Sequence, residues 1–195
     1  SSSTPDTVWE HYGLTPEEAA KGGMNPQMFN SFLDGTKSSI EMAAISNASG
    51  LIAPKNGLSF PPVGVHDLPQ ILKPISQGAT LFRPSHLIGL ELGVSVANAA
   101  IRGEATGSPV GLNSDVVAVA KKGLRPGEVL DGEGGYTVWG RIARAEDSLA
   151  MGGLPIGLAH GMKLKREVPE GQVVTWDDVN IVDSQAVKVR REMEA

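Results

Sequence analysis

The chain has 195 residues, which suits one large domain or two small ones, and its formal net charge is −5. The absence of a long basic run argues against nucleic-acid binding, and the absence of cysteine excludes thiol catalysis and a disulfide scaffold. No apolar run approaches the roughly 20 residues that cross a bilayer. We therefore expect a cytoplasmic protein that binds neither nucleic acid nor membranes. Because the sequence begins without methionine, we also expect a processed form or a fragment.

The first 111 residues are predicted to be largely helical. Residues 1–23 look loop-rich, apart from a short helix that begins at the Thr-Pro-Glu-Glu of residues 15–18 and stops at two glycines. A second helix is predicted from the Asn-Pro of residues 25–26 to about Gly50, and a third from about Ser85 to Arg102.

The character of the sequence changes after Asn113. Short apolar runs broken by Gly and Pro turns predict a small β-rich domain. We therefore divide the chain into a mixed, mainly helical portion at 1–111 and a β-rich portion at 112–195, which together predict an α+β fold. Residues 184–195 are expected to form a final strand or a frayed tail.

Three charged residues follow one another at helical spacing in the second predicted helix. Asp34, Lys37 and Glu41 fall within roughly 60° of each other at 100° per residue. They border an expected apolar face made of Phe29, Phe32, Leu33, Thr36, Ile40, Ala43, Ala44 and Asn47. One interpretation is a pair of exposed ion pairs. The other is a partly buried functional cluster, in which the lysine holds an oxygen or relays a proton and the carboxylates orient hydroxyls or bind a divalent metal.

Four further residues are candidates for substrate binding. His66 and Asp67 adjoin each other in a proline-bounded loop, where they form either a proton-transfer or metal group or a turn-stabilising pair. Arg83 and His86 flank the predicted start of the third helix, where the arginine either holds a phosphate or carboxylate or is simply exposed. His160 has no supporting pattern and is interpreted as a structural or surface residue. The sequence has no G-x-G-x-x-G after a strand and no P-loop, so a dinucleotide has no evident site in this chain.

Four segments together resemble a known bacterial family: MFNSFLDGTKSSIEMAAISNASGL, FPPVGVHDLP, RPSHLIGLELGVSVANAAIRGEATG and DGEGGYTVWG. The family is that of the homoserine-dehydrogenase-like NAD(P)-dependent oxidoreductases with a C-terminal SAF domain. It includes the 1-deoxy-D-xylulose 5-phosphate reductoisomerase-like enzymes, which reduce and isomerise a phosphosugar ahead of isoprenoid synthesis. The resemblance covers nearly the whole chain.

The resemblance implies an oxidoreductase of which this chain is the C-terminal portion. Family members begin with a Rossmann domain that binds NADPH or NADH, and this sequence resembles the part that follows it. The central domain is expected to supply the substrate site and the contacts of a homodimer. Asp34 and Lys37 of DGTK resemble the acid and lysine that meet the small-molecule substrate, with Glu41 one turn on. A divalent metal is expected in reductoisomerase-like members, and Asp34 and Glu41 are its candidate ligands.

Residues 115–183 resemble an SAF domain, which has a β-clip fold. Such domains elsewhere bind carbohydrate-like ligands or assist assembly, so the chain has a second interpretation as a non-catalytic carbohydrate- or anion-binding module and a third as a structural dimerisation piece. Basic side chains in this portion either contact an anion or form a solvated face; they are Lys121, Lys122, Lys163, Lys165 and Arg166.

Overall fold

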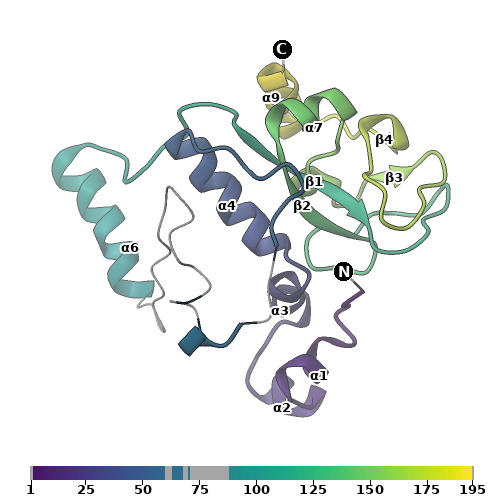
Figure 1. Ribbon diagram of the computed structural model, residues 1–195, viewed down its shortest axis with the longest axis horizontal. Coiled ribbons are helices and arrows are strands. Elements are labelled where there is room, and N and C mark those ends of the chain that lie inside the picture. The colour runs from purple at the N-terminus through teal and green to yellow at the C-terminus, as the bar shows by residue number, and fades with distance from the viewer. Residues whose placement is uncertain (1, 60–62, 68–69, 71–87, 195) are drawn as a thin grey trace. The chain divides into compact units, whose positions relative to one another are not determined.

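The structure is a computed structural model that describes residues 2–59, 63–67, 70 and 88–194. The chain divides into two units, and each is described by itself. The first combines Ser1–Leu58 with Pro109–Ala195, and the second is Ser59–Ser108. Residues from both sides of the predicted boundary near 112 thus pack together in the first unit, shown in Figure 1.

Four helices precede residue 50. They are α1 (Val8–Tyr12), α2 (Pro16–Lys21), α3 (Pro26–Leu33) and α4 (Thr36–Ser49). The predicted start of α2 is confirmed, because the Thr15 hydroxyl accepts the Glu18 N–H and the Glu18 carboxylate accepts the Thr15 N–H. Helix α1 lies where the sequence predicted mainly loop. It contributes Val8 and Trp9 to a small core, in which Trp9 and Phe29 lie 5.3 Å apart between ring centroids.

The second predicted helix is interrupted, so the expectation of one helix over residues 25–50 is wrong. Its two ends are confirmed: Asn25 caps α3 through its side chain, and Gly50 closes α4 in the left-handed conformation. Between them, Asp34 ends α3 and Gly35 turns the chain with φ 85° before α4 begins. A residue with a side chain rarely adopts that φ, so the glycine of DGTK makes the break.

The β-rich portion is built around the antiparallel pair of β1 (Ser114–Ala120) and β2 (Val138–Arg144). Ser114 lies opposite Arg144, and Ala120 lies opposite Val138. All seven residues of β1 are buried. A second small sheet pairs β3 (Lys163–Leu164) with β4 (Val179–Asn180), and isolated bridges tie β1 to Pro155 and Val173. Helices and two small antiparallel sheets agree with an α+β fold.

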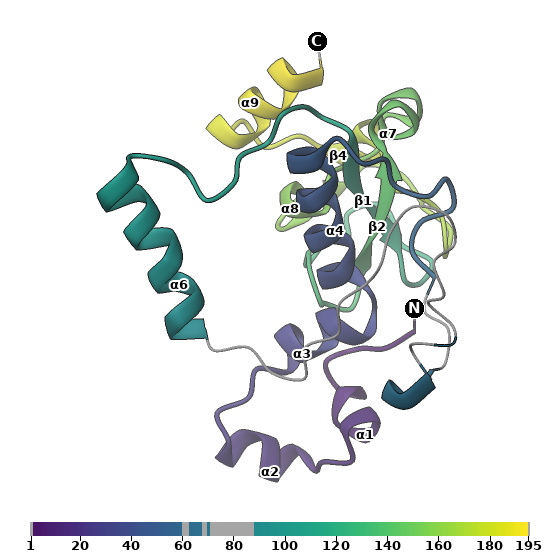
Figure 2. The same cartoon turned by 60° about the vertical axis from the view of Figure 1, so that its left-hand side comes forward.

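Helix α4 lies along β1 and β2 in both Figure 1 and Figure 2. Its buried side chains are small: Thr36, Ser39, Ala43 and Ser46. Two members of the expected apolar face, Leu33 and Ala44, are instead exposed. Small residues allow the helix backbone to approach the sheet closely, which a search for large apolar residues does not detect.

Three α-helices follow β2: α7 (Ala145–Met151), α8 (Ile156–Ala159) and α9 (Gln185–Glu194), with the 3-10 helix η3 (Trp176–Asp178) between α8 and α9. The prediction of a final strand or frayed tail is wrong, because α9 is anchored. Arg190 of α9 is buried and donates to the Asp115 carboxylate at 2.6 Å, and that carboxylate also accepts the Ser148 hydroxyl at 2.6 Å.

The second unit contains η1 (Val65–Asp67), α6 (Ile88–Ala97) and the π-helical turn η2 (Asn98–Arg102). Gly103 follows this last stretch with φ 67°, so the predicted helix end at Arg102 is confirmed. The described side chains of α6 are exposed, including Leu92, Val94 and Val96. Among the described residues, no helix is both long enough and apolar enough to cross a membrane.

Candidate functional site

The Asp34–Gly35–Thr36–Lys37 segment contains the turn between α3 and α4 and the first two residues of α4. The Asp34 carboxylate accepts the N–H of Thr36 at 2.9 Å through Oδ1, a local hydrogen bond that fixes the turn before α4. The Thr36 hydroxyl accepts the N–H of Gly140 on β2 at 2.8 Å. Both contacts are buried, so the start of α4 is held against the sheet.

Lys121, directly after β1, reaches the same turn from the other side. Its Nζ lies 2.8 Å from Oδ2 of Asp34, and the two side chains are only 3% and 0% exposed. The ammonium also donates to the carbonyls of Ser3 at 3.0 Å and Gly135 at 2.7 Å. The Lys121 ammonium thus makes two hydrogen bonds to backbone carbonyls and one ion pair inside the protein. The buried Lys121 ammonium therefore has a structural role in holding the turn.

The loop of residues 131–137 brings backbone carbonyls to this junction. The Asp131 side chain fixes the loop by accepting the N–H groups of Tyr136 and Thr137. The carbonyl of Glu133 accepts from Gln27 of α3 at 2.8 Å, and that of Gly134 accepts from Asn30 at 2.8 Å.

Gly134 lets the loop lie directly on α3. Its φ is +68°, and a Cβ there would lie 2.1 Å from the carbonyl oxygen of Gln27. We call the contacts that join α3 and the start of α4 to Lys121, the 131–137 loop and Gly140 the "polar junction".

Lys37 leaves the polar junction toward solvent. Its side chain is 46% exposed, and its Nζ lies 3.8 Å from Oε1 of Glu41, which is 58% exposed. The ammonium also lies 4.3 Å from the centroid of the Phe32 ring. A partly exposed ammonium on a rigid turn can contact a carbonyl, hydroxyl or phosphate oxygen of a ligand. The exposed-pair interpretation therefore describes Lys37 and Glu41, whereas Asp34 is buried with a different partner.

The other predicted site residues fall in the second unit or outside the described residues. His66 and Asp67 are exposed in η1, where the Asp67 N–H donates to the Gly64 carbonyl at 3.0 Å. Arg83 and His86 lie outside the described residues. Their roles in substrate binding stay predictions.

The predicted metal ligands do not fit a divalent cation in this arrangement. Asp34 directs one oxygen at a backbone N–H and the other at the Lys121 ammonium, which would compete with a metal for it. Glu41 is exposed on α4 and pairs with Lys37. Within the described ranges, no three His, Cys, Asp or Glu side chains gather in a metal-binding group.

Sequence reasoning missed the position of Lys121, which it grouped with side chains of a possible anion-binding or solvated face. The signal in the sequence was weak: Lys121 directly follows an apolar strand and precedes the exposed Lys122. Lys122 instead pairs with Glu128 at 2.7 Å, and the hydrogen bond from Lys122 holds the pKa of the Glu128 carboxyl below its usual value. Adjacent lysines with opposite burial cannot be told apart by composition.

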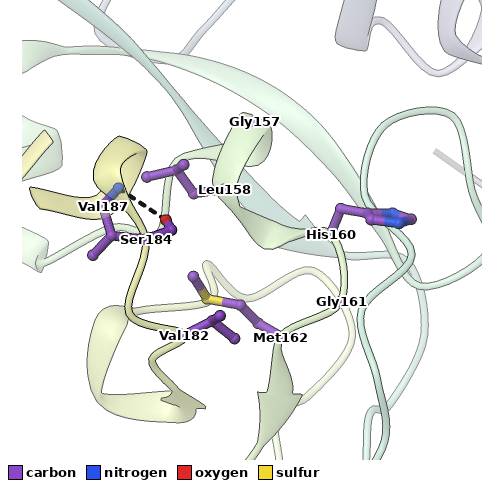
Figure 3. Close-up of a pocket in the computed structure, with 8 residues that line it drawn as sticks. All are labelled: Gly157, Leu158, His160, Gly161, Met162, Val182, Ser184 and Val187. Atoms are coloured by element: carbon purple, nitrogen blue, oxygen red, sulfur yellow. Dashed lines mark hydrogen bonds between the residues drawn. The ribbon is translucent and has the colours of Figure 1, made fainter. Parts of the chain in front are cut away.

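A pocket of about 370 Å³ lies between the end of α8 and the start of α9. Figure 3 shows that Leu158, Met162, Val182 and Val187 supply its apolar lining, while the Ser184 hydroxyl accepts the Val187 N–H. The ring of His160 turns away from these side chains, and its Nδ1 lies 3.0 Å from the Asp131 carbonyl oxygen. The pocket therefore offers apolar contact and no evident catalytic group.

The two portions of the chain match two different family models. Residues 1–81 match the model of the oxidoreductase DRL catalytic domain, and residues 115–180 match that of the SAF domain. These matches support an oxidoreductase with an SAF domain. No curated protein matches the chain. The polar junction joins the two matched segments: Asp34 and Asn30 come from the first, and Lys121 and Gly134 from the second.

Proposed function

We propose that this chain is the substrate-binding and SAF portion of an NAD(P)H-dependent oxidoreductase that acts on a hydroxylated or phosphorylated small metabolite. The supporting observation is that Lys37, inside the match to an oxidoreductase catalytic domain, is presented to solvent by a turn whose other polar groups are buried. The reaction is hydride transfer of the reductoisomerase-like or homoserine-dehydrogenase-like kind. A homodimer through the central portion is part of the proposal.

Lys37 is the group that we assign to the reacting oxygen. When bound by a part of the protein outside these residues, NADPH or NADH supplies a hydride to the carbonyl carbon of the substrate. Negative charge then develops on the carbonyl oxygen, and the Lys37 ammonium stabilises it and delivers the proton that completes the alcohol. Glu41, at 3.8 Å, forms an exposed ion pair with the Lys37 ammonium.

Asp34 acts in this proposal through the turn and does not touch the substrate. Its two oxygens hold the start of α4 and Lys121, which fixes the backbone from which Lys37 projects. No step runs through a metal, because the surroundings of Asp34 and Glu41 do not fit one. Substrate-binding roles for Arg83, His66, Asp67 and His86 stay predictions from the sequence.

Replacement of Lys37 tests the proposal. In the full-length protein that contains these residues, turnover is followed by the absorbance of the reduced nicotinamide. The trial substrates are 1-deoxy-D-xylulose 5-phosphate with NADPH and homoserine with NAD⁺. Lys37→Ala is expected to lower kcat by about 10²–10⁴-fold, the range typical of a lost proton donor.

The matched control is Lys21→Ala, because Lys21 is an exposed lysine in the last turn of α2, outside the polar junction. It is expected to leave kcat unchanged. Thermal unfolding of both variants should match that of the unaltered protein. A Lys37→Ala enzyme with near-normal kcat would contradict the assignment.

The SAF match supports a second candidate function, a non-catalytic carbohydrate- or anion-binding module. It predicts that a sugar phosphate binds without nucleotide and that Lys37→Ala leaves its Kd unchanged. Nicotinamide-linked turnover of the full-length protein separates the two candidates, because the module has none. Turnover that is lost in Lys37→Ala would exclude a purely non-catalytic module.

A further inference from the structure

A polar pocket lies on β2, away from the proposed reaction site. It has a volume of about 430 Å³ and is lined by Lys55, Asn56, Arg141, Ile142, Ala143, Asp147, Ala150 and Met151. That volume falls within the range usual for small-molecule sites. Lys55 and Asn56 belong to the oxidoreductase match, and the other lining residues belong to the SAF match. The pocket thus requires both segments and uses no residue of the polar junction.

The segment after α4 is held in place over β2. The Gly57 N–H donates to the Pro54 carbonyl at 3.1 Å, which closes a turn with Lys55 and Asn56 at its corners. Arg144 of β2 donates to the Ala53 carbonyl at 3.2 Å and anchors the segment just before the turn. The turn therefore presents Lys55 and Asn56 at a defined place on the strand.

Gly57 allows the turn to lie directly on Arg141. Its φ is +79°, and a Cβ there would lie 3.3 Å from Cγ of Arg141 and 3.4 Å from the Ile142 carbonyl oxygen. Both the left-handed backbone and the short contact favour glycine. The aliphatic part of Arg141 is thereby covered by backbone.

The two cations of this pocket differ from their neighbours because they lack an ion-pair partner. Arg144, on the same strand, lies 3.8 Å from Glu146, whereas Arg141 and Lys55 form no ion pair within the part of the chain that the structure describes. Asp147 also lines the pocket but forms no ion pair with either cation, so the two cations favour an anion, and a guanidinium suits the paired oxygens of a phosphate.

The Asp147 carboxylate indicates which groups the ligand carries besides its anionic end. The Asp147 carboxylate lines the same pocket and can only accept hydrogen bonds when ionised. Asn56 adds one donor and one acceptor group, and Ile142, Ala150 and Met151 supply apolar wall. A ligand that satisfies all of these groups carries a phosphate at one end and hydroxyl donors at the other.

We propose that this pocket binds a phosphorylated polyol of sugar-phosphate size, with the phosphate on Lys55 and Arg141 and the hydroxyls on Asp147 and Asn56. The inference goes beyond the proposed oxidoreductase activity, because none of these residues belongs to the predicted catalytic set. The proposal places a separate binding site where the two matched segments meet.

Titration with defined probes tests this site. Ribose 5-phosphate, inorganic phosphate and ribose are titrated into the full-length protein by calorimetry, with Arg141→Gln, Lys55→Met, Asp147→Asn and Lys37→Met variants. Arg141→Gln and Lys55→Met are each expected to raise the Kd for ribose 5-phosphate at least tenfold, and Lys37→Met to leave it within twofold. Asp147→Asn is expected to weaken ribose 5-phosphate and leave inorganic phosphate unchanged. Ribose should bind far more weakly than either phosphate.

The proposal is overturned if ribose 5-phosphate does not bind, or if Lys55→Met and Arg141→Gln both bind it normally. It is also overturned if Lys37→Met removes all binding, which would place the only phosphate site at the reaction centre. Inorganic phosphate that binds as tightly as ribose 5-phosphate would overturn the polyol part. Lys55 lies on an exposed turn, so its variant keeps the test decisive if Arg141→Gln does not fold. If Lys37→Ala loses kcat but still binds ribose 5-phosphate in this pocket, the pocket is distinct from the proposed reaction site.

Discussion

Asp34 and Lys37 lie three residues apart, yet the ion pairs that they form differ in burial. Asp34 and Lys121 are almost fully enclosed and 2.8 Å apart, whereas Lys37 and Glu41 are about half exposed and 3.8 Å apart. Exposed pairs contribute about 0–1 kcal/mol to stability, while removal of one partner from a buried pair costs several. In the DGTK segment, the buried Asp34 therefore stabilises the structure, whereas the exposed Lys37 is available to a substrate.

Substitution of Lys121 should have the largest effect on stability. Lys121→Met leaves the Asp34 carboxylate buried without its counter-charge, so we expect a loss of about 3–5 kcal/mol in the free energy of unfolding, measured with urea. Lys37→Met, the matched exposed lysine, should change it by less than about 1 kcal/mol. Adding Asp34→Asn to Lys121→Met should recover part of the loss. Equal losses for the two lysines would remove the distinction between the pairs.

A second comparison uses two glycines with similar backbone. Gly134 and Gly171 have φ of +68° and +79°, but a Cβ at Gly134 would meet the Gln27 carbonyl at 2.1 Å, whereas one at Gly171 would meet nothing within 4 Å. Gly171→Ala should cost only the left-handed strain, about 1–2 kcal/mol. Gly134→Ala should cost about 1–3 kcal/mol more, because the loop must move off α3. Equal midpoints in urea would show that the loop does not press on α3.

The smallest effect concerns acid stability in the SAF portion. Burial would raise the pKa of Asp178, but hydrogen bonds from Arg166 and Thr175 outweigh it and hold the pKa below its usual value near 3.8. A lowered folded-state pKa gives stability that is present above about pH 3.8 and is lost as the pH falls through the folded-state value.

Arg166→Met removes the hydrogen bond that stabilises the Asp178 carboxylate. The acid-unfolding midpoint, followed by circular dichroism, should move to higher pH. Lys165→Met, at the neighbouring exposed position, serves as the control. An unchanged midpoint in Arg166→Met would show that Arg166 does not set the pKa of Asp178.

Local signals in the sequence predicted the ends of several elements. The Thr15 capping box, the Asn25 cap and the closing glycines Gly50 and Gly103 each act within a few residues, so their effect can be read locally. The break at Gly35 was missed because the charges of DGTK fit helical spacing, although the glycine between them adopts φ 85°. Helix α9 was missed because its stability depends on Arg190 reaching Asp115 on a distant strand.

The candidate site was predictable in part. The sequence and the resemblance singled out DGTK, and the chemistry of Lys37 stays a prediction. The separation of Asp34 from Lys37 could not be read from spacing, because it depends on Lys121 after β1 and on carbonyls of the 131–137 loop. The pocket at Arg141 was equally invisible, since it requires the turn at residues 54–57 to cross β2.

The polar junction also sets an order of events during synthesis of the chain. Asn30 and Thr36 each bond to groups 104 residues further along the sequence, and Gln27 bonds to one 106 residues away. At ordinary rates of translation, their partners leave the ribosome on the order of ten seconds later. During that interval the Asp34 carboxylate stays hydrated, because Lys121 has not yet been made. The turn that presents Lys37 is therefore completed only after the following domain has begun to fold.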